Sequence, residues 1–443
     1  MNFAAIAVLR ATFQIRVGIL CLLFLICTLP SAHAEEFSRN MSIENFPVWM
    51  NEYLSQLEWG SHSKNPPVLK RDILLKSFNL GRQFMMNNQK PEGNFNYQYD
   101  FVRKKMDQDD SQVRQAGAVW GLALMYQFQQ NAANKEALDR ALAFFFKLSV
   151  PGPGKDALII TYPGTVNCRT GTVALVALSI IEYLRTEKDG KVKLPDSHRK
   201  QLIQMLNGYI AHLKYMQLNN GHFSESISVA TKVKTMRFNP YFDGETLLAL
   251  IKAAKYLGYS DLMPYIEKSA MILAKDYTVD KWRLDPDSRL TKGFFQWGCM
   301  AFWEYQDAGW KNGPVYGDCI LALAWWMIHV HRTLERTRNT GYAYEGIIHA
   351  YHLAKSRNLK AALDDLAYTI DTGLYKLTGW QVGGPLQYSN SYLLQHPTSD
   401  PLAVGGIMNH RQQAPLRIDV TQHQMHAVIL ALRYVYTHKK KSR

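Results

Sequence analysis

The chain has 443 residues, with 51 Lys and Arg against 37 Asp and Glu, and a formal net charge of +14. Such a basic balance favours anionic partners, whether an acidic polysaccharide, a membrane surface or a nucleic acid, but it says nothing about the fold. The sequence contains no Pro/Ser-rich linker and no low-complexity tract. It therefore gives no sign of a boundary between domains.

The first 34 residues have the features of a secretory signal peptide. Arg10 and Arg16 precede an apolar run from Gly18 to Leu29, and the small-residue pattern Ala32-His33-Ala34 follows. The apolar run is about a dozen residues, fewer than the roughly 18 that span a bilayer. We expect a periplasmic or secreted protein, which argues against a nucleic-acid partner. Cleavage would remove two arginines and no acidic residue, so the net charge would fall from +14 to +12.

Three cysteines follow the proposed cleavage site: Cys168, Cys299 and Cys319. In an oxidising compartment they could form one disulfide and leave one free thiol, or stay as three free thiols. Their spacing fits no zinc motif. We expect neither a metal site nor a cofactor.

The remaining chain reads as helices of two alternating kinds, because apolar residues recur with the 3.6-residue helical period. One kind is amphipathic with a charged outer face. The other is rich in Gly, Ala and apolar residues nearly all round, which is typical of a buried helix. The amphipathic segments are 69–89, 134–148, 196–217, 259–276, 315–336 and 359–377, and the buried segments are 111–129, 170–186, 243–257, 294–306, 341–355 and 421–437.

The alternation predicts an all-α fold, an (α/α)6 toroid in which six inner helices are surrounded by six outer helices. Residues 35–443 would then form a single domain. A HEAT-like open solenoid would show the same helix pairs and is the main structural alternative.

The loops divide by chemistry according to which helices they enter. Loops that leave the buried helices are short and polar, whereas loops that lead into them carry aromatic, basic and acidic residues. In a toroid the inner helices run parallel, so these loops would meet at one rim. Helix N-termini carry unpaired N–H groups and partial positive charge, and suit an anionic group.

The C-terminal stretch "PLRIDVTQHQMHA" concentrates polar residues at the start of the last buried helix. Thr421 and Gln424 have capping-box spacing, which predicts that the helix begins at Thr421. Arg417 and Asp419 would then lie in the loop, where Arg417 could clamp a carboxylate. Alternatively, the two residues simply pair with each other. His423 and His426 share a face, so one could face the cavity and the other the core.

Besides Asp419, carboxylates occur at the starts of two other buried helices. "YFDGE" contains Asp243 and Glu245, and "GYAYEG" contains Glu345. Asp243 is interpreted as a helix cap, whereas Glu245 and Glu345 could act as dipole partners or as acid/base groups. A glycosidase would hold two carboxyl groups about 5.5 Å or about 6.5–9.5 Å apart. The catalytic candidates are Glu245, Glu345, Asp419, Tyr344 and His423.

Aromatic and basic residues accompany these carboxylates. Aromatic rings suit stacking against the C–H faces of sugars, and arginines suit carboxylates. An acidic glycan fits this mixture better than a neutral one. The binding candidates are Arg114, Arg169, Tyr241, Trp297, Tyr342, His410 and Arg417.

The acidic run "DQDD" at residues 107–110 is similar to the DxDD proton donor of class II terpene cyclases, which are also helical toroids. An exported enzyme would not readily meet isoprenoid diphosphates. We therefore interpret Asp110 and Ser111 as a helix cap.

Two stretches carry a resemblance to known families. "YFDGE" and "NHRQQAPLRIDVTQHQMHA" resemble secreted bacterial (α/α)6 proteins associated with polysaccharides, and "LRIDVTQHQMH" is similar to the C-terminal helical part of glucuronyl C5-epimerases. The latter resemblance implies that Arg417 and Asp419 position a uronate while tyrosine and glutamate side chains exchange its C5 proton. The chain lacks the β-rich portion that precedes the helical domain of those epimerases. The resemblance therefore supports the fold more strongly than it supports the activity.

The sequence thus predicts an exported enzyme acting on an acidic or neutral glycan at the mouth of a toroid. The reaction would be glycoside hydrolysis, or epimerisation or elimination at a uronate. The alternative is a non-catalytic glycan-binding or assembly protein of an envelope polysaccharide system.

Overall fold

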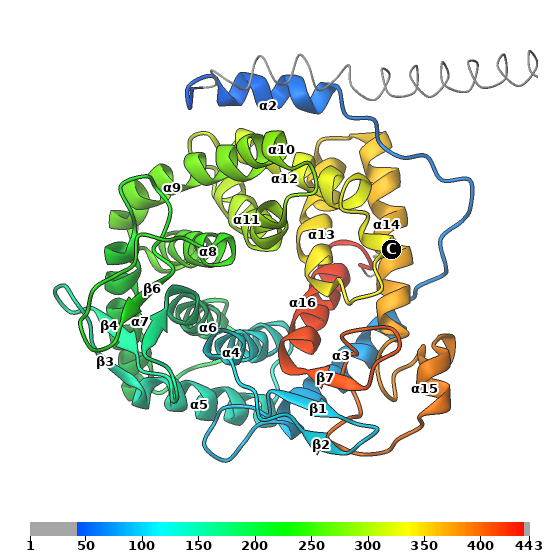
Figure 1. Ribbon diagram of the computed structural model, residues 1–443, viewed down its shortest axis with the longest axis horizontal. Helices are drawn as coiled ribbons and strands as arrows, with labels where there is room; N and C mark the ends of the chain where they lie inside the picture. The colour runs from blue at the N-terminus through cyan, green and yellow to red at the C-terminus, as the bar shows by residue number, and fades with distance from the viewer. Residues whose placement is uncertain (1–41, 438–443) are drawn as a thin grey trace, which may run out of the picture.

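The computed structural model describes residues 42–437. The proposed signal peptide and the domain start at residue 35 lie outside this range. Within it, the helices form two concentric rings, with the inner helices seen nearly end-on (Figure 1). The predicted all-α toroid is confirmed.

The inner ring consists of the helices that the sequence marks as buried. They are α4 (Gln112–Phe128), α6 (Thr170–Lys188), α8 (Pro240–Leu257), α11 (Arg289–Asp307), α13 (Gly341–Ser356) and α16 (Ile418–Tyr434). Each packs against the next along the chain, and α16 packs against α4. The ring is therefore closed, which excludes an open solenoid.

Each inner helix is backed by one outer helix. The outer helices are α3 (Arg71–Asn87), α5 (Ala132–Lys147), α7 (Asp196–Met216), α9 (Met263–Lys275), α12 (Gly313–His329) and α14 (Lys360–Thr378). A π-helical turn (Asp276–Asp280) and the short α10 (Lys281–Leu284) extend α9 toward α11.

Glycines on the inner helices allow the helices to approach closely. A Cβ on Gly244 of α8 would lie 2.4 Å from the Trp297 Cβ of α11, and one on Gly121 of α4 would lie 2.4 Å from Cγ of Gln422 in α16. Neither distance is compatible with a real side chain, so both glycines are required by packing. This explains why the buried helices are rich in glycine.

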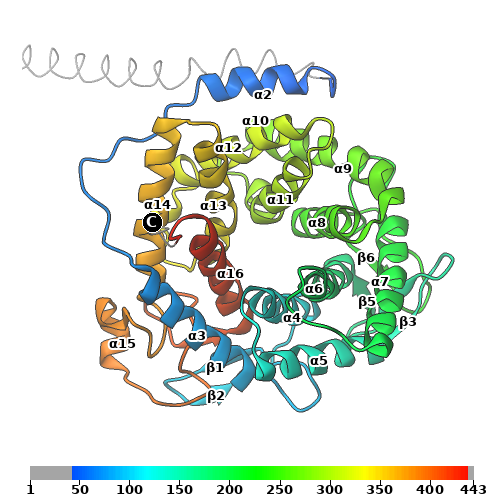
Figure 2. The ribbon, with the colours of Figure 1, turned by 180° about the vertical axis from the view of Figure 1, so that it is seen from behind.

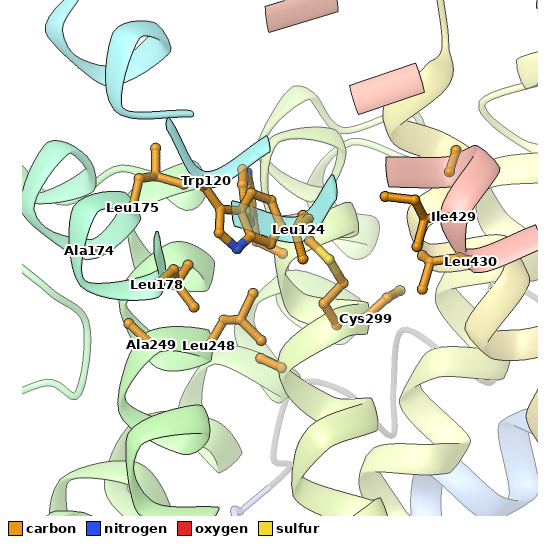
Figure 3. Packing of buried hydrophobic residues seen from close by; sticks show 14 of the residues in the cluster. Trp120, Leu124, Ala174, Leu175, Leu178, Leu248, Ala249, Cys299, Ile429 and Leu430 are labelled. Atoms are coloured by element: carbon orange, nitrogen blue, oxygen red, sulfur yellow. The ribbon is translucent and has the colours of Figure 1, made fainter. Parts of the chain in front are cut away.

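The centre of the ring is filled by apolar side chains below the mouth. Trp120 and Leu124 of α4 lie among Leu175, Leu248 and Ile429 from three other inner helices (Figure 3). The toroid is thus a packed core with a depression at one end rather than an open pore.

Buried ion pairs join the inner helices at the end remote from their N-termini. Lys255 Nζ lies 2.6 Å from Glu304 Oε2, Lys252 Nζ lies 3.3 Å from Glu304 Oε1, and Lys252 also pairs with Glu182. Arg185 Nη1 lies 2.8 Å from the second oxygen of Glu182. These cations also complement the helix C-termini, where the backbone carries partial negative charge.

A helix that the sequence analysis did not expect covers part of the outer ring. Helix α2 (Phe46–Ser55) packs on α12 and lies outside the ring in both views (Figures 1 and 2). The expected charged outer face of segment 315–336 was wrong, because α12 is almost wholly apolar and α2 covers it. The chain after α2 is tied down where Asp365 accepts hydrogen bonds from His62 and His329 Nε2, each at 2.8 Å.

Short antiparallel strands order the loops at the mouth. Strand β1 (Gln98–Asp100) lies between β2 (Lys105–Met106) and β7 (Pro415–Arg417), and β5 (Asn167–Arg169) pairs with β6 (Ser226–Ser228). Strands β3 (Ser149–Pro151) and β4 (Leu158–Ile160) form a separate hairpin. The pairing holds Arg417 opposite Gln98 and Arg169 opposite Ser226, so both arginines leave ordered strands at the rim.

Two other features of the described range bear on the sequence analysis. Cys168, Cys299 and Cys319 are all free and buried, so of the two possibilities the structure shows three thiols. None of the helices between residues 42 and 437 is both long enough and apolar enough to cross a membrane.

Candidate functional site

A cavity of about 1150 Å³ opens at the N-terminal ends of the inner helices. Every inner helix, or the loop just before it, contributes to its wall. The prediction that the chemically distinctive loops gather at one rim is confirmed. The predicted site residues that line the cavity are Arg114, Arg169, Tyr241, Glu245, Trp297, Tyr342, Arg417, Asp419 and His423.

Helix α16 begins earlier than the capping-box spacing predicts. It starts at Ile418 directly after β7, and Arg417 is its N-cap residue without a side-chain cap. The hydroxyl of Thr421 instead accepts a hydrogen bond from the Ile407 backbone N–H at 3.0 Å. The predicted start at Thr421 was wrong because β7 delivers the chain straight into the helix, and Asp419 therefore lies in the first turn.

Arg417 and Asp419 do pair, and a second arginine joins them. Arg417 donates from Nε to Asp419 Oδ1 at 2.6 Å and from Nη2 to Oδ2 at 2.9 Å. Arg114 Nε lies 3.3 Å from Asp419 Oδ2, and Arg114 also donates to the Tyr97 hydroxyl. One carboxylate faces two guanidinium groups, so the cluster keeps one net positive charge at the cavity wall.

His423 is oriented by a carboxylate behind it. Its Nδ1 lies 3.2 Å from both Oε1 and Oε2 of Glu345, and His426 Nδ1 lies 2.9 Å from Oε1. An ionised carboxylate only accepts, so Nδ1 of His423 donates and Nε2 carries the lone pair. Nε2 of His423 makes no hydrogen bond to any residue between 42 and 437. The histidine therefore presents a free basic nitrogen while its side chain is 20% exposed at the cavity.

The histidine and its carboxylate shift each other's titration. Burial alone would lower the pKa of His423, but the adjacent Glu345 outweighs burial and raises that pKa above its usual value. Burial would likewise raise the pKa of Glu345, but His423 and His426 hold it below the usual value. Glu345 thus favours its ionised form, and the same interaction makes His423 a stronger base than a free histidine.

Glu345 does not reach the cavity itself. Its side chain is fully buried behind the two histidines, so it can act only through them. Sequence reasoning placed it at a helix start but could not show that a histidine 78 residues away would cover it.

Glu245 has the opposite environment. It lines the cavity at 2% exposure, and Oε2 has no hydrogen-bond partner among the described residues. A Cβ on Gly171 would lie 2.2 Å from this oxygen, so the carboxyl group fits against the start of α6. Burial raises the pKa of Glu245 well above its usual value, because it disfavours the charged form of the carboxyl group.

Tyr344 and His410 lie away from the cavity wall. The Tyr344 hydroxyl is directed toward Gly373 of outer helix α14, where a Cβ would overlap it, and the side chain is fully buried. Tyr342 and Tyr344 are two positions apart on a helix and so face different sides, and only Tyr342 faces the cavity. His410 pairs through its backbone with Arg338 just outside the wall.

Aromatic rings form the wall around His423. Trp297 lies edge to face with His423 at 6.0 Å between ring centroids and contacts Trp120 at 5.1 Å. Trp120 also contacts His426 at 5.0 Å. The aromatic rings therefore hold both histidines of the Glu345 cluster in place.

Several cavity residues were missed by the sequence analysis. His331 and Arg336 line the cavity, but the sequence analysis placed them within the predicted amphipathic helix 315–336. The helix ends at His329, and Arg332 adopts a left-handed conformation with φ 56°, for which the sequence offers no glycine signal. Asp110 also lines the cavity: it accepts hydrogen bonds from Tyr162 at 2.6 Å and from Gln115 at 2.8 Å, while Ser111 makes no side-chain cap.

Positive charge dominates the cavity wall. Its cationic side chains are Arg114, Arg169, Lys292, Arg336, Arg338 and Arg417, and its carboxyl groups are Asp110, Glu245 and Asp419. Cationic side chains therefore outnumber carboxyl groups on the wall, and burial disfavours the charged form of one of these carboxyl groups, Glu245. In the part of the chain that the structure describes, no three His, Cys, Asp or Glu side chains are grouped so that they could hold a metal ion.

No protein-family model matches the sequence. No curated protein sequence matches it either. Solved structures do resemble it. A D-mannose isomerase has a TM-score of 0.56 at 11% identity, over 84% of this chain and 100% of that one. The cellobiose 2-epimerase of Bacillus thermoamylovorans B4167 has a TM-score of 0.55 at 10% identity, over 81% of this chain and 98% of that one. The GH76A alpha-1,6-mannanase of Salegentibacter sp. HEL1_6 has a TM-score of 0.53 at 9% identity, again over 81% and 98%. At these identities the likeness shows the fold: the chain has the (α/α)6-toroid architecture of these carbohydrate-active enzymes.

Proposed function

We propose that the protein is an exported enzyme that acts on an acidic glycan by moving the C5 proton of a uronate residue. The observation that carries this proposal is the His423–Glu345 pair, which offers a free imidazole nitrogen in the same cavity as Arg114 and Arg417. A base beside cations is what proton abstraction next to a carboxylate requires.

The chemistry follows from the position of each group. Arg114 and Arg417, which Asp419 compensates only in part, neutralise the uronate carboxylate and stabilise the negative charge that forms on it. Nε2 of His423 takes the C5 proton and becomes an imidazolium opposite Glu345. Protonated Glu245 then returns a proton to C5, which gives an epimer, or protonates the group that leaves C4, which gives an unsaturated sugar. Solvent restores both protonation states.

The similar solved structures support a carbohydrate substrate in general. They include a cellobiose 2-epimerase, a D-mannose isomerase and an alpha-1,6-mannanase, all named for reactions on sugars. The basic cavity favours an acidic sugar among these classes.

Glycoside hydrolysis is the second candidate, and Glu245 favours it. A glycosidase uses an acid with a raised pKa and a second carboxyl group in one cavity, and Glu245 and Asp419 would fill these roles. The two arginines that hold Asp419 make it a positioning group rather than a free nucleophile or base, which ranks this candidate second.

Product analysis on a panel of acidic and neutral oligosaccharides tests the proposal. We expect wild-type protein to epimerise or cleave a uronate-containing substrate without net hydrolysis. The His423→Gln variant should retain binding and lose about 100-fold or more in turnover. The matched control is Glu335→Gln, which removes an exposed carboxylate outside the cavity.

Other outcomes decide between the alternatives. Hydrolysed products that depend on Glu245 and Asp419 but not on His423 would establish the second candidate. Binding without turnover on every glycan, by wild type as well as the variants, would establish a non-catalytic glycan-binding protein.

A further inference from the structure

A second group of cations lines the cavity, apart from Arg114 and Arg417. Lys292 lies in the first turn of α11, and Arg336 and Arg338 lie in the loop that enters α13. Lys292 Nζ stands 5.5 Å from the ring centroid of Tyr342. No described carboxylate forms an ion pair with Lys292 or Arg338, so both charges are open to the cavity.

Asp287 does not neutralise the positive charge of this group. Asp287 accepts from His331 Nδ1 at 2.7 Å and pairs with Arg336 at 3.1 Å, so one carboxylate is already shared by two partners. Burial lowers the pKa of Lys292, and Arg336 and Arg338 lower it further. Burial and the neighbouring arginines thus disfavour the charged ammonium more than Asp287 favours it, and an anion placed beside the ammonium would stabilise it.

The two cationic groups enter the mouth at different inner helices, the first at α4 and α16 and the second at α11 and α13. Along the closed inner ring, α11 is three helices from α4 in either direction, so Lys292 and Arg114 start from opposite sides (Figure 1). Tyr241 connects them: its ring packs on Gly293, where a Cβ would lie 2.9 Å from it, and its side chain is 39% exposed. Tyr241 and Tyr342 therefore provide apolar ring faces between the cationic groups, on which a sugar ring can stack.

We propose that Lys292, Arg336 and Arg338 form a second anion subsite, so that the cavity holds a glycan segment with two anionic groups. One anionic group binds at Arg114 and Arg417, and the other binds at this subsite. The proposal rests on the proposed function for the identity of the ligand as a glycan, but the subsite itself is defined by its charges alone.

Sulfate is a suitable probe because it reports on the subsite without any knowledge of the glycan. We expect sulfate to raise the unfolding temperature of the wild-type protein at constant ionic strength, since a ligand that binds the folded state stabilises it. The Lys292→Gln/Arg338→Gln double variant should show a smaller rise. The matched control Arg332→Gln, which removes a cation of the same loop outside the cavity, should behave like wild type and thereby account for general salt effects.

Stability without sulfate provides a second readout. Because Lys292 and Arg338 are uncompensated, the double variant should unfold at the same or a higher temperature than wild type. An equal sulfate response in all three proteins, or a double variant that is unstable without sulfate, would overturn the subsite.

The glycan itself is then tested with a uronate trisaccharide and its carboxyl-reduced counterpart. The double variant should bind the charged trisaccharide about tenfold more weakly and the reduced one equally well, which corresponds to about 1.4 kcal/mol. If wild type turns over no glycan while the sulfate effect still depends on Lys292 and Arg338, the proposed function fails and the subsite stands. If turnover occurs without any such dependence, the subsite fails alone.

Discussion

His423 and Glu345 illustrate how a buried acid can serve a site that it does not touch. The carboxylate fixes the tautomer of the imidazole through Nδ1 and leaves Nε2 free toward the cavity. In the proposed reaction it would also supply the negative charge that stabilises the imidazolium formed after proton abstraction. Glu345 is in this sense a positioning residue, and its replacement should be visible in the titration of His423.

We predict that Glu345→Gln lowers the pKa that governs activity. The carboxylate is what raises the pKa of His423 above its usual value, and without it only the lowering effect of burial remains. Activity that needs neutral His423 rises with pH through this pKa, so the rising limb should move to lower pH in the variant. The measurement is the pH dependence of kcat/KM for wild type and variant. A limb that stays in place would show that His423 does not carry the reaction.

The sequence predicted which residues belong to the site better than it predicted which of them contact one another. Arg417 and Asp419 are two residues apart, so their pairing could be expected from the sequence. The third member, Arg114, and the pairing of His423 with Glu345 depend on closure of the ring between distant helices. No local spacing encodes such contacts.

The inner helices are held together by glycine contacts, and two glycines make a matched pair. A Cβ on Gly244 would lie 2.4 Å from Trp297, whereas a Cβ on Gly117 would meet nothing closer than 3.7 Å. Both positions are interior to inner helices, where alanine is intrinsically favoured over glycine by about 1 kcal/mol.

We predict opposite effects of the same substitution at these positions. Gly244→Ala should destabilise the protein by about 1–3 kcal/mol through overpacking and displace Trp297 beside His423. Gly117→Ala should be neutral or stabilising by up to about 1 kcal/mol. Denaturant unfolding of the two variants checks this, and equal destabilisation would contradict the close packing of α8 and α11.

Helix type was predictable from the sequence, whereas helix ends were not. Periodicity and composition separated the inner from the outer helices, because burial is repeated over several turns, but they did not show that α12 is apolar nearly all round or that α2 covers it. The start of α16 and the end of α12 depend on β7 and on a left-handed Arg332, both of which are settled by tertiary contacts. These errors mattered for function, since the end of α12 frees His331 and Arg336 for the cavity.

Two histidines are buried in the described part of the chain in surroundings that disfavour their charged form. His212 of α7 is completely buried, and neither ring nitrogen has a partner among the described residues. Burial lowers its pKa to about 3. Burial also lowers the pKa of His349 to about 3.

We predict that the protein loses stability in mild acid. Below the usual histidine pKa of about 6.5, these histidines bind protons in the unfolded chain but stay neutral in the folded chain. The free energy of unfolding therefore falls as pH decreases toward 3. Each such histidine contributes about 1.5 kcal/mol to the loss between pH 6.5 and 5. The free energy of unfolding is measured for wild type and His212→Leu at both pH values. Its decrease from pH 6.5 to pH 5 should be smaller in the variant by about 1.5 kcal/mol. An equal decrease in wild type and variant would contradict the claim that His212 is buried in its neutral form.

The central claim is that the toroid mouth moves the C5 proton of a uronate through His423. The most direct test is to incubate uronate oligosaccharides with the protein in D₂O and follow C5 by NMR. We predict that wild type, and the control His352→Ala at the far end of α13, exchange the C5 proton for deuterium or remove it to give an unsaturated uronate, whereas His423→Ala does neither. Loss of the C5 proton that persists in His423→Ala, or product formation by wild type with the C5 proton retained, would contradict the claim.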